Sequence, residues 1–271
     1  MLHPAKTRAA AGLRVRQSGA AATKANVTSA LAKMARPSGD FDARRYFRGD
    51  HGLQFYNVGT KSMRALARSI VDPHRDRWSV EDAMKLAERL ITDPHLETKG
   101  VGIEIVARFR RTFTPALLPR WRRWLAANHS ANWATTDAIC GALIGPLLVR
   151  YPQLAPRMRS WSREGNLWVR RASIVSLIPL VRKGQSLDLA YEIAHTLHAD
   201  QEDLIEKAVG WTLREAGKID ARRLERYLRA NGPIMPRTTV RYAIERFAEP
   251  KRRALLDVTR RAGEPGARHV V

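Results

Sequence analysis

The chain has 271 residues and a mass of 30.6 kDa, enough for one large domain or two of ordinary size. Hydrophobic residues make up 44% of it and charged residues 27%, a composition that excludes a disordered or fibrous protein. The net charge of +22 indicates a polyanionic partner, although an excess of arginine can also reflect a genome rich in G and C.

Residues 1–39 carry seven basic side chains and no acidic one, with Ala, Ser and Gly between them. They lack the apolar stretch of a secretory signal, so we expect a flexible basic arm that attracts phosphates. An arginine-rich transit segment is the alternative. Residues 263–271 are expected to form a flexible tail, which leaves 40–262 as the folded domain.

From Asp40 onward the apolar residues recur at helical spacing, and the alternation typical of strands is hard to find, so the sequence predicts an all-α fold. Capping residues such as Ser79 and Asp220 mark where helices begin. The pattern predicts helices over residues 61–71, 80–92, 95–112, 116–127, 131–149, 153–163, 166–182, 186–198, 201–216, 220–230, 236–247 and 250–261.

Helices that begin near residues 131, 166 and 201 start about 35 residues apart, with one helix between each two. This period is typical of an α-solenoid of HEAT-like helix pairs, in which alternate helices line one concave face. In a chain of this charge, the concave face is expected to be basic. A compact irregular bundle is the alternative, because the repeats share little sequence.

Each of these three helices carries a tryptophan next to polar side chains. Residues three or four apart on a helix share a face, so these side chains form a continuous aromatic and charged surface. Its members are Trp133 and Asp137 on the first helix, Trp168, Arg170 and Arg171 on the second, and Lys207, Trp211 and Arg214 on the third.

Asp137 is the unusual member of this surface, because it stands among apolar residues in a strongly basic chain. A carboxylate placed against DNA phosphates weakens binding by repulsion, so its presence in a binding groove needs a reason. Stabilising a developing cation is one such reason. The alternative is that the tryptophans belong to the core and the charges to its solvated rim.

Motifs for metal or cofactor chemistry are missing from the sequence. It has no paired cysteines, no HExxH and no glycine-rich phosphate loop. His195 and His198 lack a third ligand nearby, and Cys140 lies in an apolar run, as expected of a packed thiol rather than a nucleophile. No metal and no cofactor are therefore expected. No run reaches the roughly eighteen apolar residues of a transmembrane helix, so no membrane partner is expected either.

Three segments resemble the AlkD family of DNA alkylation-repair glycosylases, in the family's order and at close to its separations. They are Asn132–Asp137, Asn166–Ala172 and Glu206–Glu215, with weaker support from Arg45–Phe47 and Asp93–Glu97, and the likeness covers residues 40–250. The resemblance implies a bacterial-type DNA glycosylase of HEAT-like repeats that acts in base excision repair. Such an enzyme removes cationic alkylated purines, such as 3-methyladenine and 7-methylguanine, from double-stranded DNA without flipping the base.

The same resemblance assigns roles to individual residues. Asp137 corresponds to the family's catalytic aspartate, and Trp133 and Trp211 to its active-site tryptophans. The DNA contacts that it implies come from Tyr46, an aromatic at the cleft, Arg171, a phosphate-contacting arginine, and Arg170, Lys207 and Arg214, which contact the DNA backbone. We further expect a monomer in the cytoplasm, associated with the bacterial nucleoid.

The sequence departs from the family at three positions. Asn57 stands where the family usually has Gly, and Lys61 where it has Pro; we expect the turn to survive because Asn tolerates a left-handed backbone. Asn132 stands where some members carry an aromatic residue, which leaves the lesion preference open. Two other functions stay open as well: a non-catalytic HEAT-repeat protein that binds DNA or branched junctions, and a protein-binding scaffold.

Overall fold

The computed structural model describes residues 23–37, 47 and 52–260. Within these residues the chain is helical, apart from turns and one isolated bridge between Gln54 and His95, so the predicted all-α fold is confirmed. No helix in the described ranges is long and apolar enough to cross a membrane.

The α-helices follow one another along the whole described chain. They are α1 (Lys24–Met34), α2 (Thr60–Val71), α3 (Val80–Leu90), α4 (Leu96–Ala107), α5 (Leu118–Ala126), α6 (Trp133–Ile139), α7 (Gly145–Arg150), α8 (Met158–Trp161), α9 (Leu167–Val175), α10 (Ile178–Val181), α11 (Leu187–Thr196), α12 (Asp203–Ile219), α13 (Ala221–Asn231), α14 (Arg237–Ala243) and α15 (Glu249–Val258).

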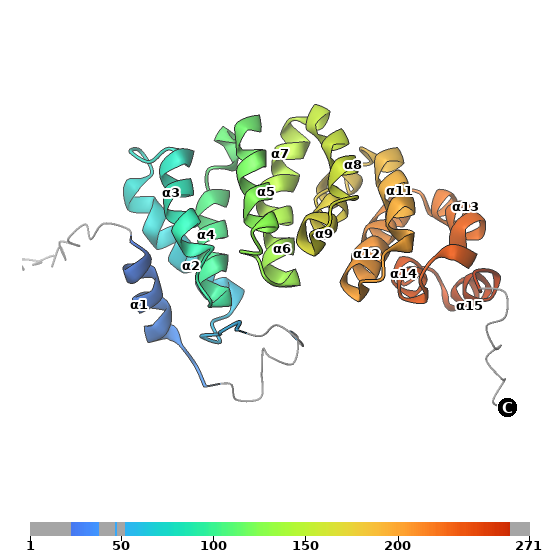
Figure 1. The fold of residues 1–271 in the computed structure, drawn as a ribbon, viewed down its shortest axis with the longest axis horizontal. Helices are drawn as coiled ribbons and strands as arrows, with labels where there is room; N and C mark the ends of the chain where they lie inside the picture. The colour runs from blue at the N-terminus through green and yellow to red at the C-terminus, as the bar shows by residue number, and fades with distance from the viewer. Residues whose placement is uncertain (1–22, 38–46, 48–51, 261–271) are drawn as a thin grey trace, which may run out of the picture.

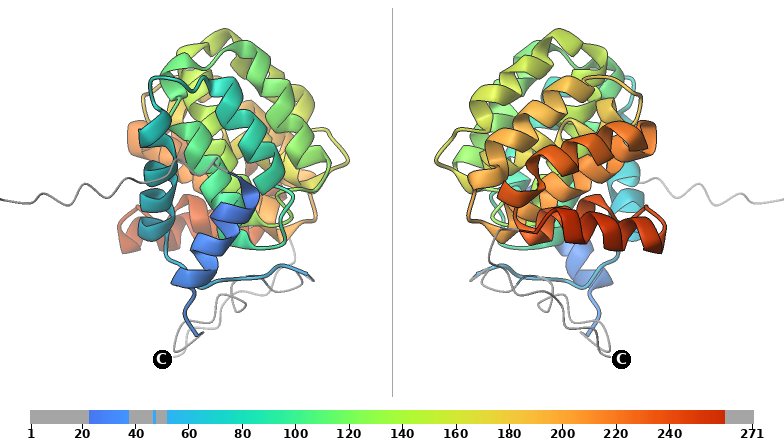
Figure 2. Two further views of the ribbon diagram at one scale, coloured as in Figure 1. Left: turned by 90° about the vertical axis from the view of Figure 1, so that its left-hand side faces the viewer. Right: turned by 90° about the vertical axis from the view of Figure 1, so that its right-hand side faces the viewer.

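The helices stack side by side in one curved row that runs from α1 to α15 (Figure 1). Helices α2, α4, α6, α9, α12 and α14 form one layer in which each contacts the next. Seen along the row from either end, successive helices lie one behind another (Figure 2). Because α6, α9 and α12 begin at Trp133, Leu167 and Asp203, the predicted repeat period is confirmed.

Helix α1 corrects the arm that the sequence predicts over residues 1–39, because Lys24–Met34 are helical and packed. Val27 and Leu31 are four residues apart, so they share a face and are buried in the core. Thr23 caps the helix by accepting a hydrogen bond from the backbone N–H of Asn26. The basic composition of this segment obscures a short apolar stripe. Residues 1–22 and 38–39 of the predicted arm and the tail over 263–271 lie outside the described residues.

Two of the predicted helices differ from a regular α-helix near a proline. The first, over 131–149, consists of α6, a π-helical turn over Cys140–Ile144, and α7. Pro146 has no N–H to donate, and the turn ends with the N–H of Gly145 donating five residues back, to the Cys140 carbonyl. The second, over 166–182, is divided into α9 and α10 just before Pro179.

Ion pairs connect successive repeats on the other layer of helices. Arg120 of α5 contacts Glu88 of α3 at 2.7 Å, and Arg159 of α8 contacts Glu192 of α11 at 2.7 Å. The partners lie 32 and 33 residues apart in the chain, close to one repeat. A single pair of this kind near the surface contributes at most about 1 kcal/mol, so the buried apolar side chains supply most of the stability of the row.

Candidate active site

The three helices that carry the tryptophan motifs meet at one guanidinium group. Arg171 of α9 donates from Nε to Oδ1 of Asp137 and from Nη2 to Oδ2, both at 2.8 Å, so its contact with α6 is bidentate. Its remaining nitrogen, Nη1, donates to the backbone carbonyl of Leu204 in α12. The orientation of the Asp137 carboxylate is therefore fixed by two neighbouring repeats.

Both partners of this ion pair are largely buried, with 6% of the Arg171 side chain and 17% of the Asp137 side chain exposed. Burial raises the pKa of the Asp137 carboxyl above its ordinary value, and hydrogen bonding and charge from Arg171 oppose that rise. Arg171 therefore opposes the protonation of Asp137 that burial favours.

Asn132 fixes where α6 begins. Its side-chain oxygen accepts a hydrogen bond from the backbone N–H of Thr135 at 2.8 Å, and its amide donates to the Ser130 carbonyl at 2.8 Å. Asn132 is completely buried, so this cap is shielded from water. It sets Trp133 at the first position of the helix and Asp137 one turn later. Asn132, which stands where some family members carry an aromatic residue, is therefore a capping residue in this chain.

An aromatic residue from outside the repeats stacks on Trp133. The ring centroids of Phe47 and Trp133 are 5.4 Å apart with an interplanar angle of 17°, and Phe47 also contacts Phe55 at 5.5 Å. The sequence-predicted aromatic, Tyr46, lies outside the described residues. Sequence reasoning missed Phe47 as a site residue, although it stands in the Arg45–Phe47 segment that drew attention to Tyr46.

A cavity of about 820 Å³ opens beside Asp137, between α2, α4 and the α6–α7 region. Apolar or small residues such as Met63, Ile103 and Ala138 form much of its wall. Arg64 and Glu104, which pair at 2.9 Å, line it as well. Asp137 therefore lies at the boundary between a buried ion pair and a cavity large enough for a substrate group.

Trp211 and Trp168 differ in exposure. Trp211 of α12 is partly buried against the core, as is Trp133, so part of each indole is accessible. Trp168 is only 8% exposed and belongs to the core. Trp168 is therefore a packing residue, as the alternative interpretation of the tryptophans as core residues predicts.

The predicted DNA-contacting cations already have carboxylate partners. Arg170 contacts Asp200 at 2.6 Å and also donates to the carbonyls of Glu164 and Gly165. Each of these contacts fixes the guanidinium close to α9, and 18% of the Arg170 side chain is exposed.

Two further cations on α12 are paired as well. Lys207 contacts Asp203 one turn earlier on the same helix, and Arg214 contacts Glu245, which follows α14. A phosphate that binds Arg214 therefore competes with a carboxylate for the same guanidinium.

The chemistry of the remaining reactive groups is limited. Cys140, the first residue of the π-helical turn, is completely buried, and burial raises the pKa of its thiol to about 12, so the prediction of a packed thiol is confirmed. Among the described residues, no three His, Cys, Asp or Glu side chains come together closely enough to hold a metal ion.

Comparisons with known proteins bear on the family and the fold of the chain. The sequence profile of a family described as DNA alkylation repair enzyme matches residues 27–247. Among solved structures, the chain is similar to a protein from Enterococcus faecalis described as a predicted DNA alkylation repair enzyme, with a TM-score of 0.66 and 17% identity. The match covers 79% of this chain and 98% of that one, and at this identity it shows a shared fold. No match is found among curated proteins.

Proposed function

Because this chain belongs to the DNA alkylation repair enzyme family, we propose that it is a DNA N-glycosylase that excises cationic alkylated purines from duplex DNA in base excision repair. The candidate substrates are 3-methyladenine and 7-methylguanine. The observation that carries the proposal is a single carboxylate, Asp137, oriented by a buried guanidinium at the edge of a cavity. The net charge of +22 supports a polyanionic substrate.

One carboxylate is sufficient for this reaction. A purine alkylated at N3 or N7 is positively charged and leaves as a neutral base, so the enzyme needs no general acid, whereas glycosidases that act on neutral sugars use two carboxyl groups. As the N-glycosidic bond lengthens, the deoxyribose gains oxocarbenium character. Asp137 stabilises that charge or positions the attacking water. Neither step calls for a metal or another cofactor.

The tryptophans attract the positive charge in addition to Asp137. The faces of Trp133 and Trp211 hold the cationic lesion or sugar, an interaction that contributes about 0.5–2 kcal/mol each. The Phe47 ring lies against Trp133 and keeps the indole in place. Many enzymes that act on bases extrude the nucleotide into a deep pocket. We propose that this one leaves the base stacked and selects the lesion by its charge and by the shape of the duplex.

The cations of the row position the DNA. Arg170, Lys207 and Arg214 contact phosphates after exchanging their carboxylate partners, and they fix the register of the duplex without reading its sequence. Arg171 is oriented toward Asp137 and serves first to keep that carboxylate charged. A row of helix pairs closes its core without a second chain, so we propose a monomer that acts in the cytoplasm at the bacterial nucleoid.

The test is release of methylated bases from duplex DNA by the full chain, with the variant Asp137→Asn beside it. The wild type is expected to release 7-methylguanine or 3-methyladenine. The variant is expected to lose most of this activity and to bind duplex as tightly or more tightly, because a negative charge is removed from a basic face. Glu192→Gln is the matched control, since it neutralises a carboxylate of an exposed ion pair in the other layer.

Equal release by Asp137→Asn would overturn the assigned role. If the wild type releases nothing while both proteins bind duplex in a salt-sensitive way, the chain is a DNA- or junction-binding protein without chemistry. Binding to a protein partner that ignores salt, without binding to DNA, would indicate a scaffold.

A further inference from the structure

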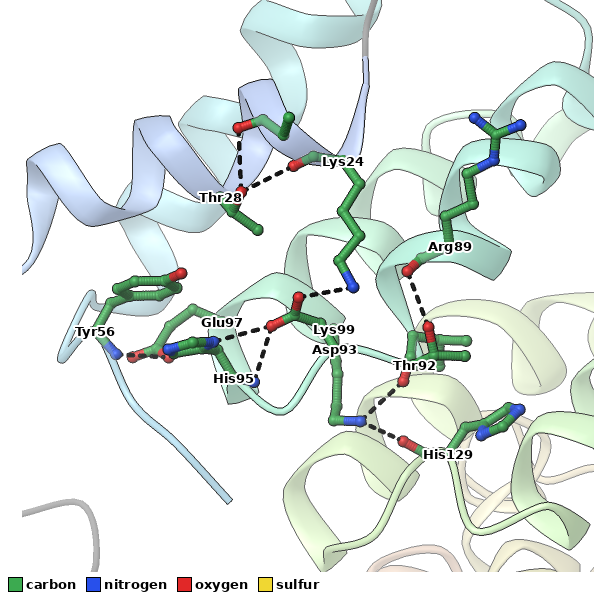
Figure 3. Close-up of polar contacts among 12 residues, drawn as sticks. Lys24, Thr28, Tyr56, Arg89, Thr92, Asp93, His95, Glu97, Lys99 and His129 are labelled. Carbon is green, nitrogen blue, oxygen red and sulfur yellow. Dashed lines mark hydrogen bonds and ion pairs between the residues drawn. The ribbon is translucent and has the colours of Figure 1, made fainter. Parts of the chain in front are cut away.

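The first turn of α4 carries two charged side chains that the proposed chemistry does not use. Glu97 is 3% exposed and Lys99 is 5% exposed, although charged residues are rarely so buried. Figure 3 shows that they extend to different parts of the fold, Glu97 toward Tyr56 and Lys99 toward His129. Each therefore connects α4 to a different segment of the chain.

Glu97 binds the segment that leads into α2. One oxygen accepts the N–H of Tyr56 and the other accepts the N–H of Val58, each at 3.1 Å. Asn57, between them, has a left-handed backbone with φ of 57°, as expected for this turn. A left-handed residue lets neighbouring N–H groups converge on one anion, and here the anion is the Glu97 carboxylate. Phe55 of the same segment contacts Phe47.

Lys99 binds the loop that leads into α6. Its ammonium donates to the Ile91 carbonyl at 2.8 Å and to the His129 carbonyl at 2.7 Å. The loop contains two left-handed residues, Asn128 with φ of 57° and Ala131 with φ of 54°. It is therefore a strained connection that tertiary contacts must hold in shape.

These two segments meet at the aromatic pair beside Asp137. Phe47 belongs to the side that Glu97 holds, and Trp133 directly follows the loop that Lys99 holds. We propose that Glu97 and Lys99 are positioning residues that together set the stack of Phe47 on Trp133, and thereby the aromatic wall next to the carboxylate. This role in excision rests on the proposed function, whereas the placement of the stack does not.

The experiment follows Trp133 directly. The full chain is labelled with 5-fluorotryptophan, and the ¹⁹F resonance of Trp133 is assigned with the variant Trp133→Phe. Glu97→Gln keeps the shape of the side chain and removes its charge, and Lys99→Met removes the ammonium at similar length. Lys24→Met is the matched control, because Lys24 lies in the same polar cluster and pairs with Asp93 (Figure 3).

We expect Glu97→Gln and Lys99→Met to shift or broaden the Trp133 resonance, and Lys24→Met to leave it in place. In single-turnover excision the two positioning variants are expected to lose about ten- to hundredfold in rate, as small misplacements of a site do, with little change in the Kd for undamaged duplex. If Lys99→Met does not fold, Lys99→Arg is the second variant, since it keeps the positive charge but replaces the compact ammonium that binds the two carbonyls with a planar guanidinium.

The outcomes separate the two proposals. An unmoved Trp133 resonance in both variants, even with a lower melting temperature, overturns the positioning role and leaves Glu97 and Lys99 as ordinary structural residues. A shifted resonance in a chain whose wild type excises nothing supports the placement of the stack and refutes the glycosylase. A shifted resonance with an undiminished excision rate shows that the stack does not serve catalysis and overturns the inferred role.

Discussion

Arg171 donates a hydrogen bond of 2.8 Å to each carboxylate oxygen of Asp137, although the two residues lie 34 positions apart in the chain. The same guanidinium reaches the Leu204 carbonyl, so one side chain connects α6, α9 and α12. The carboxylate to which we assign the excision chemistry is thus held in place by contacts between neighbouring repeats.

The first prediction concerns the stability of this ion pair. Arg171→Ala leaves a buried carboxylate without a partner, which is expected to lower the free energy of unfolding by about 3–5 kcal/mol. The double variant Asp137→Ala/Arg171→Ala is expected to be less destabilised than the single one, because neither charge remains. Urea unfolding of the wild type and the variants measures this, and a single variant as stable as the wild type would refute the coupling.

The second prediction concerns the fall of the excision rate at low pH. Burial raises the pKa of Asp137 above its ordinary 3.8, against the opposing effect of Arg171. Only the carboxylate form stabilises a developing cation, so the excision rate is complete above the raised pKa and falls as the pH falls through it. Single-turnover rates between pH 4 and 8 test this. Arg171→Lys, which cannot grip both oxygens, should move this fall to higher pH; an identical profile would contradict the assignment.

The third prediction concerns Lys99 and stability. Burial lowers the pKa of its ammonium to about 8 from an ordinary 10.5, with Asp93 raising it and Lys24 lowering it further. Between these two pH values the unfolded chain holds the proton that the native chain has released. The contribution of Lys99 to the free energy of unfolding therefore rises with pH across this window. Below pH 8 the native chain bears the full cost of burying the charged ammonium.

Thermal unfolding at pH 7, 8, 9 and 10 measures this for the wild type and for Lys99→Met. The melting temperature of the wild type should improve relative to the variant as the pH rises. A constant difference over the series would show that Lys99 has the same pKa in both states.

The fourth prediction concerns competition for Arg214. In the free protein its guanidinium is paired with Glu245, whose side chain is about half exposed. Glu245→Gln removes the nearer and more exposed of the two carboxylates beside Arg214, since Glu215 is buried and lies 3.9 Å from Nε, and it is expected to tighten duplex binding by about two- to fivefold. Arg214→Gln should weaken binding and reduce the slope of log K against log salt by about one. Fluorescence anisotropy over a salt series decides this; if neither variant changes the affinity, Arg214 does not contact phosphate.

The repeats could be predicted from sequence because their information is local. The tryptophan-bearing helices begin at Trp133, Leu167 and Asp203, within two residues of the predicted starts, since caps and apolar spacing mark them. Helix α1 was missed because its apolar stripe consists of Val27 and Leu31 within a basic segment. The π-helical turn before Pro146 and the break between α9 and α10 were missed because apolar residues continue at helical spacing on both sides.

The site is less predictable, because its contacts join distant repeats. Spacing places Trp133 and Asp137 on one face, but nothing local shows that Arg171 contacts the carboxylate rather than a phosphate. The carboxylate partners of Arg170 and Arg214 lie 30 and 31 residues away in the chain. The stack of Phe47 on Trp133 joins two segments that are far apart in the chain, and no sequence pattern predicts that they meet.

The π-helical turn over Cys140–Ile144 has a consequence for how the site can vary. Such a turn is wider than an α-helical turn and holds about one residue more, so the additional residue adds little rotation to the helix that follows. The face of α6 that carries Asp137 and the face of α7 that packs on α10 therefore keep the relation of a continuous helix. Deleting one residue from this turn is expected to convert it to ordinary α-helix while Asp137 still faces Arg171, so the chain can change length beside the candidate site without loss of the ion pair.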